Sequence, residues 1–309
     1  MTERRSSTWL EIVLPFIIFT AIWGSTWIVI RDQLGVVPPQ WSVTYRFTIA
    51  AVAMAILAKV KGRSLLLDRD GMRAALLIGF IQFCVNYNSV YLAERHITSG
   101  IVATISALML IPNSLLGWAF LGQRPGKRFT IGSVVAVAGI GLLCVHEFRS
   151  SSAPAPEVVT GIGFTLLGLM AASVTNVYQA REQLRRHHLA TLLAWSMAIG
   201  AVIDGGFAWV LTGPPVFVDR PGYWIGVFYL GVFASALTFS LYFPVVRKIG
   251  PGKAAYSSVL VPVIAMGFST VIEDYRWTAI AIAGAVLTLA GMLIAISRSR
   301  SVVHSPDAA

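Results

Sequence analysis

The chain has 309 residues, of which 56% are hydrophobic and 12% are charged, and its formal net charge is +10. A soluble globular domain carries about 25% charged residues, so this composition excludes a protein whose whole surface faces water. The mean hydropathy of +0.72 indicates that lipid is the solvent for most of the chain. The two cysteines, Cys84 and Cys144, both fall in apolar runs and indicate neither a metal site nor a disulfide framework.

Ten apolar runs approach or exceed the roughly 20 residues that a helix needs to cross a bilayer. The first run follows Arg4 and Arg5 and is too long for the core of a signal peptide, so we expect it to remain as an uncleaved span. The sequence therefore predicts an all-α membrane protein with ten transmembrane helices, of which the fifth and the tenth are short. The expected spans are residues 10–30, 41–58, 72–91, 101–121, 130–145, 159–180, 191–212, 223–246, 254–272 and 279–296.

Ten positions of the first half recur in the second half at an offset of 150 or 152 residues, which indicates an internal duplication. Each copy holds five spans, and because five is odd, the second copy enters the membrane from the opposite side. We therefore expect two inverted five-helix repeats at 10–145 and 159–296, a flexible linker at 146–158 and a cytoplasmic tail at 297–309. The repeated pairs are Ser25 and Thr175, Arg31 and Arg181, Gly79 and Gly231, Arg95 and Arg247, Ile97 and Ile249, Gly100 and Gly252, Pro112 and Pro262, Gln123 and Glu273, Gly132 and Gly284, and Gly139 and Gly291.

The distribution of basic residues predicts how the spans are oriented. With a cytoplasmic N-terminus, the inner connections hold eighteen Lys and Arg residues and the outer connections hold five, which is a strong positive-inside pattern. We expect both termini to be cytoplasmic and the membrane to be the inner membrane of a bacterium. This placement also explains the net charge, and no interleaving of basic and aromatic residues indicates a nucleic-acid partner.

The ionisable residues argue against an enzyme. All five histidines lie at or beyond the ends of the expected spans, so no Ser–His or His–carboxylate arrangement and no set of metal ligands can be drawn inside the membrane. No lysine lies in the middle of a span, which excludes a retinal Schiff base. We expect no catalytic residue, no metal and no cofactor.

Only two charged residues lie well inside the expected spans, Arg46 in the second and Asp204 in the seventh. A charge inside a membrane costs at least a few kcal/mol and usually marks a functional or a paired group. Two interpretations stay open. Arg46 and Asp204 form an ion pair, or each side chain reaches the interface or a local polar partner.

Neutral amide and aromatic side chains gather in the first, third, sixth, eighth and ninth expected spans. Because an amide in contact with hydrocarbon is costly, these side chains should point toward the interior of the bundle. They either line a cavity or form hydrogen bonds between helices, which contribute about 0.6 kcal/mol each on average in membranes. For the set as a whole we expect a cavity that binds an apolar or zwitterionic solute. Trp23, Tyr87, Tyr178, Tyr242 and Tyr256 would stack on the solute, and Gln82, Asn86, Asn176 and Thr238 would hydrogen-bond to it.

Pro112 and Pro262 occupy equivalent positions in the fourth and ninth expected spans. Because proline removes a helical hydrogen bond and kinks a helix, paired prolines in corresponding spans indicate a substrate site, and we expect both to act as gating kinks. The spans that carry the polar residues hold no Asp or Glu away from their ends. We therefore expect weak proton coupling, none, or coupling through a group that the sequence does not identify.

Together these features resemble the drug/metabolite transporter superfamily, and within it the EamA-like family. The resemblance lies in the ten spans in two inverted halves, in the repeated proline followed by glycine-rich final spans, in Arg46, and in Trp23-Gly24-Ser25-Thr26-Trp27 leading to Arg31. Within the family, the chain is most similar to YddG-type exporters of aromatic amino acids. The resemblance implies a central cavity formed by spans 1, 3, 4, 6, 8 and 9, and alternating access by rocking of the two halves.

Two departures from the family pattern concern acidic residues. Many members have a Gly-Glu pair at the end of the fourth span, whereas here Gly122 is followed by Gln123. The small four-span relatives couple transport to protons through a glutamate in the first span, and here that span has no acid deeper than Glu11.

We therefore expect a multi-pass transporter that acts as a monomer and exports small metabolites, with aromatic and other neutral amino acids favoured. Its partners would be the small-molecule substrate and the lipid bilayer. One alternative is a carrier of another drug or metabolite, in export or in uptake. A membrane-embedded sensor or scaffold is the alternative from a different class, and a large soluble domain would favour it.

Overall fold

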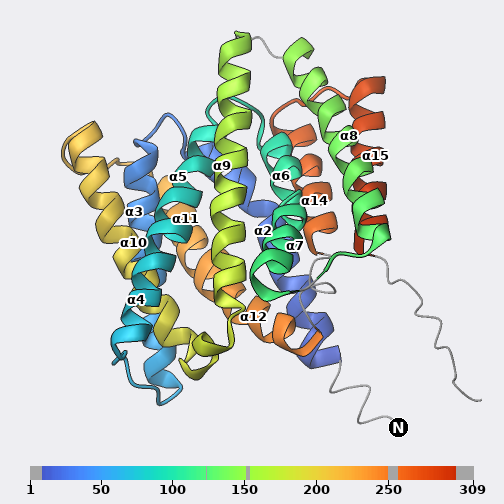
Figure 1. Ribbon diagram of the computed structural model, residues 1–309. Coiled ribbons are helices and arrows are strands. Elements are labelled where there is room, and N and C mark those ends of the chain that lie inside the picture. Colours follow the sequence, from blue (N-terminus) through green and yellow to red (C-terminus); the bar gives the residue numbers. More distant parts are fainter. Residues whose placement is uncertain (1–8, 123, 151–153, 250–256, 297–309) are drawn as a thin grey trace, which may run out of the picture.

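The computed structural model describes residues 9–122, 124–150, 154–249 and 257–296, and within these ranges every regular element is helical. Eight segments are long and apolar enough to cross a membrane, which agrees with the expected all-α membrane protein. Two further apolar helices in the described ranges are shorter, Leu260–Ile272 and Ala279–Ala295. Figure 1 shows the helices side by side in one bundle.

Eight labelled helical elements precede α8 in the described residues. The fourth expected span is divided between α6 and α7, and the third is divided among α4, η2 and α5. The bounds are η1 Trp9–Val13, α2 Leu14–Gln33, α3 Pro39–Val60, α4 Arg69–Ile78, η2 Gly79–Asn86, α5 Tyr87–Ala93, α6 Ser99–Ala107 and α7 Leu110–Leu121.

After the long helix α8, the second half repeats the order of the first half, in which two long helices are followed by a divided one. The eighth expected span is divided among α11, η4 and α12, as the third is among α4, η2 and α5. The bounds are α8 Lys127–Ser150, α9 Ala155–Gln179, η3 Glu182–Arg186, α10 Leu189–Thr212, α11 Pro221–Phe228, η4 Tyr229–Leu237, α12 Thr238–Ile249, α14 Ser257–Ile272 and α15 Ala279–Ile296.

Two sequence-based boundaries differ from the structure. The fifth expected span was predicted to be short, but α8 has 24 residues because its polar ends, from Lys127 and up to Ser150, also adopt the helix. The expected linker is helical at both of its ends, since α8 ends at Ser150 and α9 begins at Ala155. Pro154 and Pro156 are compatible with this start, because the first turn of a helix has no intrahelical partner for its N–H groups.

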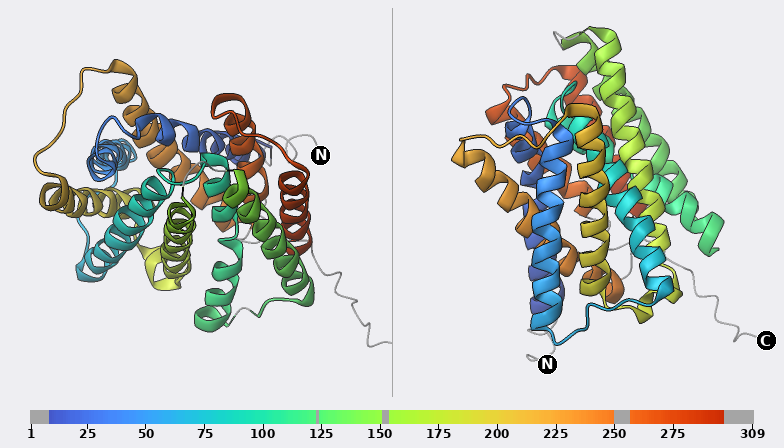
Figure 2. Two further views of the ribbon diagram at one scale, coloured as in Figure 1. Left: turned by 90° about the horizontal axis from the view of Figure 1, so that it is seen from above. Right: turned by 90° about the vertical axis from the view of Figure 1, so that its left-hand side faces the viewer.

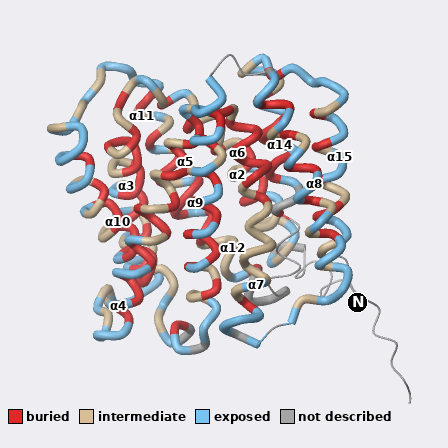
Figure 3. Tube along the Cα trace, turned by 45° about the horizontal axis from the view of Figure 1, so that its top comes forward, coloured by how far each residue is buried: buried red, intermediate tan, exposed pale blue. Residues whose placement is uncertain are grey.

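The surface and the interior have the polarity expected of a protein in lipid. Large apolar side chains are exposed on the outer faces of the helices, for example Val202 at 76% and Val134 at 65%. Charged and polar side chains are buried instead, among them Arg46, Asp204 and Glu94. Figure 3 shows the buried residues along the middle of the bundle and the exposed residues on its outer faces.

At one edge of the bundle, α8 and α15 pack with their backbones in close contact (Figure 1). A β-carbon at Gly291 would lie 2.6 Å from the carbonyl oxygen of Gly132, and one at Gly284 would lie 2.9 Å from that of Gly139. Only residues without a side chain allow this approach. In the sequence repeat, Gly132 corresponds to Gly284, and Gly139 corresponds to Gly291. Because Gly132 contacts Gly291 while Gly139 contacts Gly284, the two repeats contribute equivalent residues, as in a self-complementary two-fold contact.

A second reciprocal contact involves α3 and α10, which lie at the other side of the bundle from α15 (Figure 2). A β-carbon at Gly79 would lie 2.7 Å from the carbonyl oxygen of Ser196 on α10, and one at Gly231 would lie 2.9 Å from that of Arg46 on α3. Arg46 and Ser196 are 150 residues apart, which is one of the two offsets of the repeat. The two glycines therefore make equivalent contacts with opposite halves of the chain.

Both of these glycines belong to π-helical segments, η2 in the third expected span and η4 in the eighth. π-Helical turns are rare and frequently lie at functional sites. Advancing η2 by 152 residues superimposes it almost completely on η4, so the two segments are counterparts. The hydrophobic pattern of the sequence did not indicate either of them.

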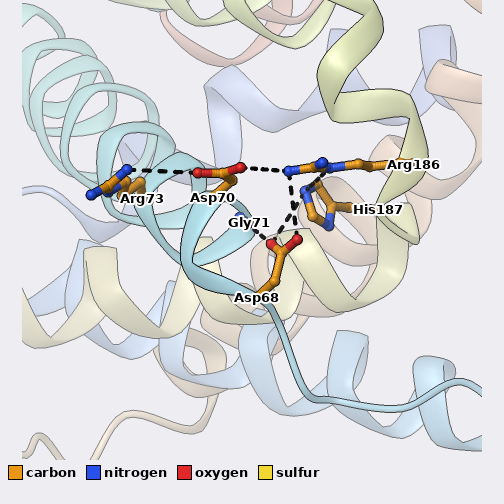
Figure 4. A network of polar contacts seen from close by, with 6 residues as sticks. All are labelled: Asp68, Asp70, Gly71, Arg73, Arg186 and His187. Carbon is orange, nitrogen blue, oxygen red and sulfur yellow. Dashed lines mark hydrogen bonds and ion pairs between the residues drawn. The ribbon is translucent and has the colours of Figure 1, made fainter.

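Polar contacts join the start of α4 to η3 and the residue that follows it (Figure 4). Asp68 caps α4 by accepting a hydrogen bond from the Gly71 amide at 2.7 Å. The Arg186 guanidinium lies 2.7 Å from Asp70 and 3.5 Å from Asp68, and His187 lies 3.6 Å from Asp68. The Gly71 amide, with smaller contributions from His187 and Arg186, holds the pKa of Asp68 below its usual range.

Candidate functional site

A cavity of about 190 Å³ lies in the interior between helices from both expected halves. The helices that line it are α2, α5 with η2, α6, α9, α12 and α14, which correspond to spans 1, 3, 4, 6, 8 and 9, and α3 adds one residue. The lining residues are Trp23, Thr26, Trp27, Ile30, Arg46, Gln82, Asn86, Tyr87, Val90, Ala103, Ser106, Ala107, Met109, Leu169, Ala172, Asn176, Phe239, Tyr242, Ser257, Val261 and Pro262.

One wall of the cavity is aromatic. The Trp23 ring lies 5.0 Å from the Tyr242 ring and 5.8 Å from the Phe239 ring, measured between centroids. The indole N–H of Trp23 donates a hydrogen bond to the Ala234 carbonyl of η4 at 3.2 Å, which joins the ring on α2 to η4. This wall presents flat, polarisable surfaces on which a planar apolar group can stack.

Three amide side chains line the cavity, Gln82 and Asn86 from η2 and Asn176 from α9. The Gln82 carbonyl oxygen accepts a hydrogen bond from the Thr175 hydroxyl, and the Asn176 amide donates to the Met109 sulfur at 3.5 Å. Thioether sulfur is a weak acceptor, so a better acceptor in the cavity would compete for the Asn176 amide.

Arg46 contributes the one charged group among the described residues of the lining. Its side chain is 1% exposed, and its Nε donates to the Ser235 hydroxyl at 3.1 Å. The guanidinium carbon lies 4.5 Å from the centroid of the Tyr87 ring, which is a cation–π distance. The Nη1 atom is buried and has no hydrogen-bond partner in the structure.

The ion pair between Arg46 and Asp204, one of the two interpretations left open by the sequence, is not among the ion pairs of the described residues. Asp204 on α10 is fully buried and accepts a hydrogen bond from the Asn88 amide at 2.5 Å. Ser235 and Tyr87 are the partners of Arg46 instead. The other interpretation, a local polar partner for each charge, is the one that the structure supports, because different helices place neutral groups beside each side chain.

The structure brings together most of the residues that the sequence singled out as the substrate site, but Thr238, Tyr178 and Pro112 do not line the cavity. Thr238 is fully buried, but its hydroxyl donates to the Ala234 carbonyl at 2.6 Å. Tyr178 does not belong to the lining, and its ring lies 5.5 Å from the Arg181 guanidinium. Pro112 is also not part of the lining. Tyr256 lies outside the described residues.

The two prolines differ in their local effect. Pro112 lies in the first turn of α7, and the helix is interrupted four residues earlier, at Leu108. In an uninterrupted helix, the proline ring would clash with the carbonyl group of Leu108. Pro262 lies inside α14, which begins about one turn earlier at Ser257, and it lines the cavity. Among the described residues, a helix break therefore lies beside Pro112, whereas Pro262 lies inside a continuous helix.

Some lining residues gave weak or no signals in the sequence. Trp27 lies one helical turn after Trp23, so the amphipathic spacing of these tryptophans could have indicated it. The small and aliphatic lining residues could not be identified from the sequence, because an apolar residue that lines a cavity cannot be distinguished there from one that packs in a core. These members are Ile30, Val90, Ala103, Ala107, Leu169, Ala172 and Val261.

Charged residues gather at one end of the cavity, beyond Ile30 and Val90. Arg31 on α2 lies 3.3 Å from the Glu273 carboxylate, which follows α14. The Ser99 amide donates to the same carboxylate at 3.3 Å, and the Ser99 and Ser269 hydroxyls also donate to it. We call Arg31, Ser99, Ser269 and Glu273 the α2–α14 latch, because they join these helices.

Glu94 lies beside the α2–α14 latch and is fully buried, and neither of its carboxylate oxygens has a hydrogen-bond partner among the described residues. Burial, with a smaller contribution from Glu273, raises the pKa of Glu94 well above its usual range, and Arg31 and Arg46 oppose this rise. The sequence predicted that Glu94 lies at a helix end, which holds, but its complete burial was not expected. The described residues contain no group of three His, Cys, Asp or Glu side chains that could hold a metal ion.

Comparison with known proteins gives consistent results for nearly the whole chain. The sequence pattern of the EamA-like transporter family matches residues 10–145 and 159–297. The Escherichia coli (strain K12) protein YedA, described as an uncharacterized inner membrane transporter, is 26% identical over 252 residues, which cover 81% of this chain and 78% of YedA. Protein PagO of Salmonella typhimurium is 21% identical over 266 residues, which cover 86% of this chain and 85% of PagO.

A solved crystal structure of another protein has the same fold. It superimposes with a TM-score of 0.68 at 17% sequence identity, over 91% of this chain and 95% of the other. At this identity the similarity extends to the arrangement of the helices and not to the chemistry of the cavity.

Proposed function

The chain belongs to the EamA-like transporter family, and from this premise we propose that it exports aromatic and other neutral amino acids through the cavity between its two halves. It is a multi-pass membrane transporter and not an enzyme, as its family and its apolar helices establish. The proposal adds the substrate class, the direction and the route. It also places the protein in the bacterial inner membrane as a functional monomer with both termini in the cytoplasm.

The observation that carries the proposal is the cavity itself. Trp23, Tyr242 and Tyr87 offer aromatic surfaces, and Asn86 and Asn176 offer hydrogen-bonding groups. Its volume of about 190 Å³ corresponds to about six water molecules at the density of liquid water, so it suits a small metabolite and not a large drug. A solute with an aromatic side chain and a polar backbone would use both kinds of wall.

The reciprocal glycine contacts support an inverted repeat with units at 10–145 and 159–296. Gly132 meets Gly291 while Gly139 meets Gly284, and Gly79 contacts α10 while Gly231 contacts α3. Two halves related in this way can exchange their conformations, which opens the cavity first to one side of the membrane and then to the other. We propose that Pro112, which follows the helix break at Leu108, and Pro262, which lies inside α14, act as hinges in this exchange.

The α2–α14 latch suggests which side is closed in this conformation. We assign the latch to the outer side of the membrane, because the opposite end of the bundle carries the excess of Lys and Arg, including Arg73 and Arg186. In this assignment the latch separates the cavity from the outside, and its opening would release the substrate.

Transport by the purified protein in liposomes tests the proposal. Liposomes loaded with radiolabelled phenylalanine, leucine or glutamate would be diluted into buffer without amino acid. We expect efflux of phenylalanine and leucine that exceeds the rate in empty liposomes, and efflux of glutamate that does not. Absence of flux for every neutral amino acid would refute the proposed substrate class.

A further inference from the structure

Among the described residues, no negatively charged group pairs with the Arg46 side chain. The side chain is 1% exposed, its Nε donates to the neutral hydroxyl of Ser235, and the Tyr91 hydroxyl beside it is also neutral. The faces of Tyr87 and Phe47, at 4.5 Å and 5.4 Å from the guanidinium carbon, attract the cation but carry no net charge. A buried guanidinium in such neutral surroundings is costly unless an anion reaches it.

No carboxylate among the described residues forms an ion pair with Arg46. Asp204, the one other charge deep in an expected span, is bound to Asn88. Glu94 lies close enough to influence Arg46 electrostatically, but both of its oxygens lack a partner. The buried Nη1 atom of Arg46 therefore remains as a strong donor without an acceptor.

This unpaired donor belongs to a residue that lines the cavity, where Gln82 and Asn86 are also found. We infer that Arg46 is the anchor for an anionic group of the solute, and that this group is a carboxylate. The planar guanidinium offers parallel N–H donors whose spacing matches the two oxygens of a carboxylate. A charge-assisted bond to a guanidinium that is 1% exposed is stronger than the same bond at a surface.

The anchor assigns an orientation to the solute. Arg46 lies next to Tyr87, whereas the wall formed by Trp23, Phe239 and Tyr242 belongs to α2 and α12. A solute whose carboxylate contacts Arg46 would direct its apolar part toward that aromatic wall. The inference rests on the proposed function in that the cavity must admit a solute, but it adds a specific requirement for a carboxylate.

Equilibrium binding of two matched probes tests the anchor without relying on transport. The probes are 3-phenylpropanoate and its uncharged amide, which have nearly the same shape, and binding would be measured by calorimetry on the purified protein in nanodiscs. We expect the wild-type protein to bind the carboxylate at least tenfold more tightly than the amide. In Arg46→Gln this preference should disappear, and in Arg46→Lys, which keeps the charge but loses the planar fork, it should be reduced.

Arg220→Gln is the matched control, because Arg220 is an exposed arginine that pairs with Asp32, and neither residue lines the cavity. Its preference for the carboxylate should equal that of the wild type. A water molecule on Nη1 in place of a ligand would give equal binding of the two probes, and this result overturns the inference. The inference is also overturned if neither probe binds the wild type, or if Arg46→Gln retains the preference while it elutes as a folded monodisperse protein.

Amino-acid flux reports separately on the proposed function. If neutral amino acids are transported but the carboxylate probe binds no more tightly than the amide, the transport function is supported and the role of Arg46 as an anchor is refuted. A preference for the carboxylate without flux of any amino acid would support the anchor and refute the proposed substrates.

Discussion

The Arg31 guanidinium lies 3.3 Å from the Glu273 carboxylate, and this pair connects the end of α2 to the end of α14 at one end of the cavity. The Glu273 side chain is 8% exposed and also accepts a hydrogen bond from the Ser99 amide, so the pair joins α2, α6 and α14. The position of this latch beyond the cavity is what makes a gated pathway physically reasonable.

Weakening the latch should loosen this end of the bundle. In Arg31→Gln we expect the Ser99 amide to exchange its hydrogen about two to five times faster, because a partly exposed ion pair contributes about 0.5–1 kcal/mol. Hydrogen–deuterium exchange of the peptide that contains Ser99 measures this change. Arg220→Gln, which removes the exposed pair with Asp32, should leave that peptide unaffected. Equal exchange in Arg31→Gln and the wild type would show that the latch does not hold this end closed.

Glu94 should lower stability at alkaline pH. Its pKa is raised in the folded protein, so the folded state holds the proton more tightly than the unfolded state does, and stability falls as the pH rises above the unfolded pKa. Glu94→Gln removes this effect, so its Tm should exceed that of the wild type by roughly 2–4 °C at pH 8 and by less at pH 4.5.

Thermal unfolding in detergent at the two pH values measures this difference. Glu157→Gln, at a half-exposed carboxylate, controls for the loss of one negative charge. A Glu94→Gln protein that is less stable than the wild type at pH 8 would mean that the carboxylate has a partner that stabilises its charged form.

The contact between α8 and α15 should not tolerate a methyl group. Gly132→Ala places a β-carbon against the backbone of Gly291 and Ala295, which cannot move aside as a flexible side chain can. We expect a loss of about 1–3 kcal/mol, visible as a lower Tm in detergent. Gly141→Ala, on the same helix α8 but facing open space, should leave the Tm unchanged or raise it. Similar Tm values for both variants would contradict the close packing of these helices.

Asn86 and Thr238 are counterparts in the repeat, but only Asn86 lines the cavity. Asn86→Ala should lower the flux of the transported amino acid by about tenfold at unchanged expression, since it removes a polar group that faces the solute. Thr238→Val should leave the flux within about twofold, because the Thr238 hydroxyl donates to its own helix. Rates of counterflow in liposomes give this comparison. If the two variants are affected equally, Asn86 has only a packing role.

The hydrophobic runs predicted most of the helices well, because they depend on local sequence. Gly132 and Gly139 indicated the duplication, but the close contact of α8 with α15 was not predicted from them. The sequence also indicated most of the polar lining, including Gln82, Asn86 and Asn176, because amides in lipid must point inward. The positions of the helices and the inward direction of the amides both depend on whether each side chain is more stable in lipid or in a polar environment.

Features that depend on distant pairs could not be predicted in this way. The partner of Arg46 is Ser235, which is 189 residues away, and no local pattern distinguishes it from Asp204 as a partner. The burial of Glu94 depends on the approach of α2 and α14, which brings Arg31 and Glu273 beside it. The π-helical turns η2 and η4 arise where Gly79 and Gly231 press against α10 and α3, and the hydrophobic period is too coarse to register them.

The central claim is that amino acids cross the membrane through the cavity between the two halves, and blocking that cavity tests it most directly. Ala172→Phe places a large side chain on the cavity wall of α9, whereas Val202→Phe places the same side chain on the exposed outer face of α10. Phenylalanine efflux from liposomes would be measured for both variants and the wild type, after gel filtration confirms that each is folded. We predict that Val202→Phe transports at the wild-type rate and that Ala172→Phe loses at least nine-tenths of the flux. Wild-type flux through folded Ala172→Phe would contradict the proposed route.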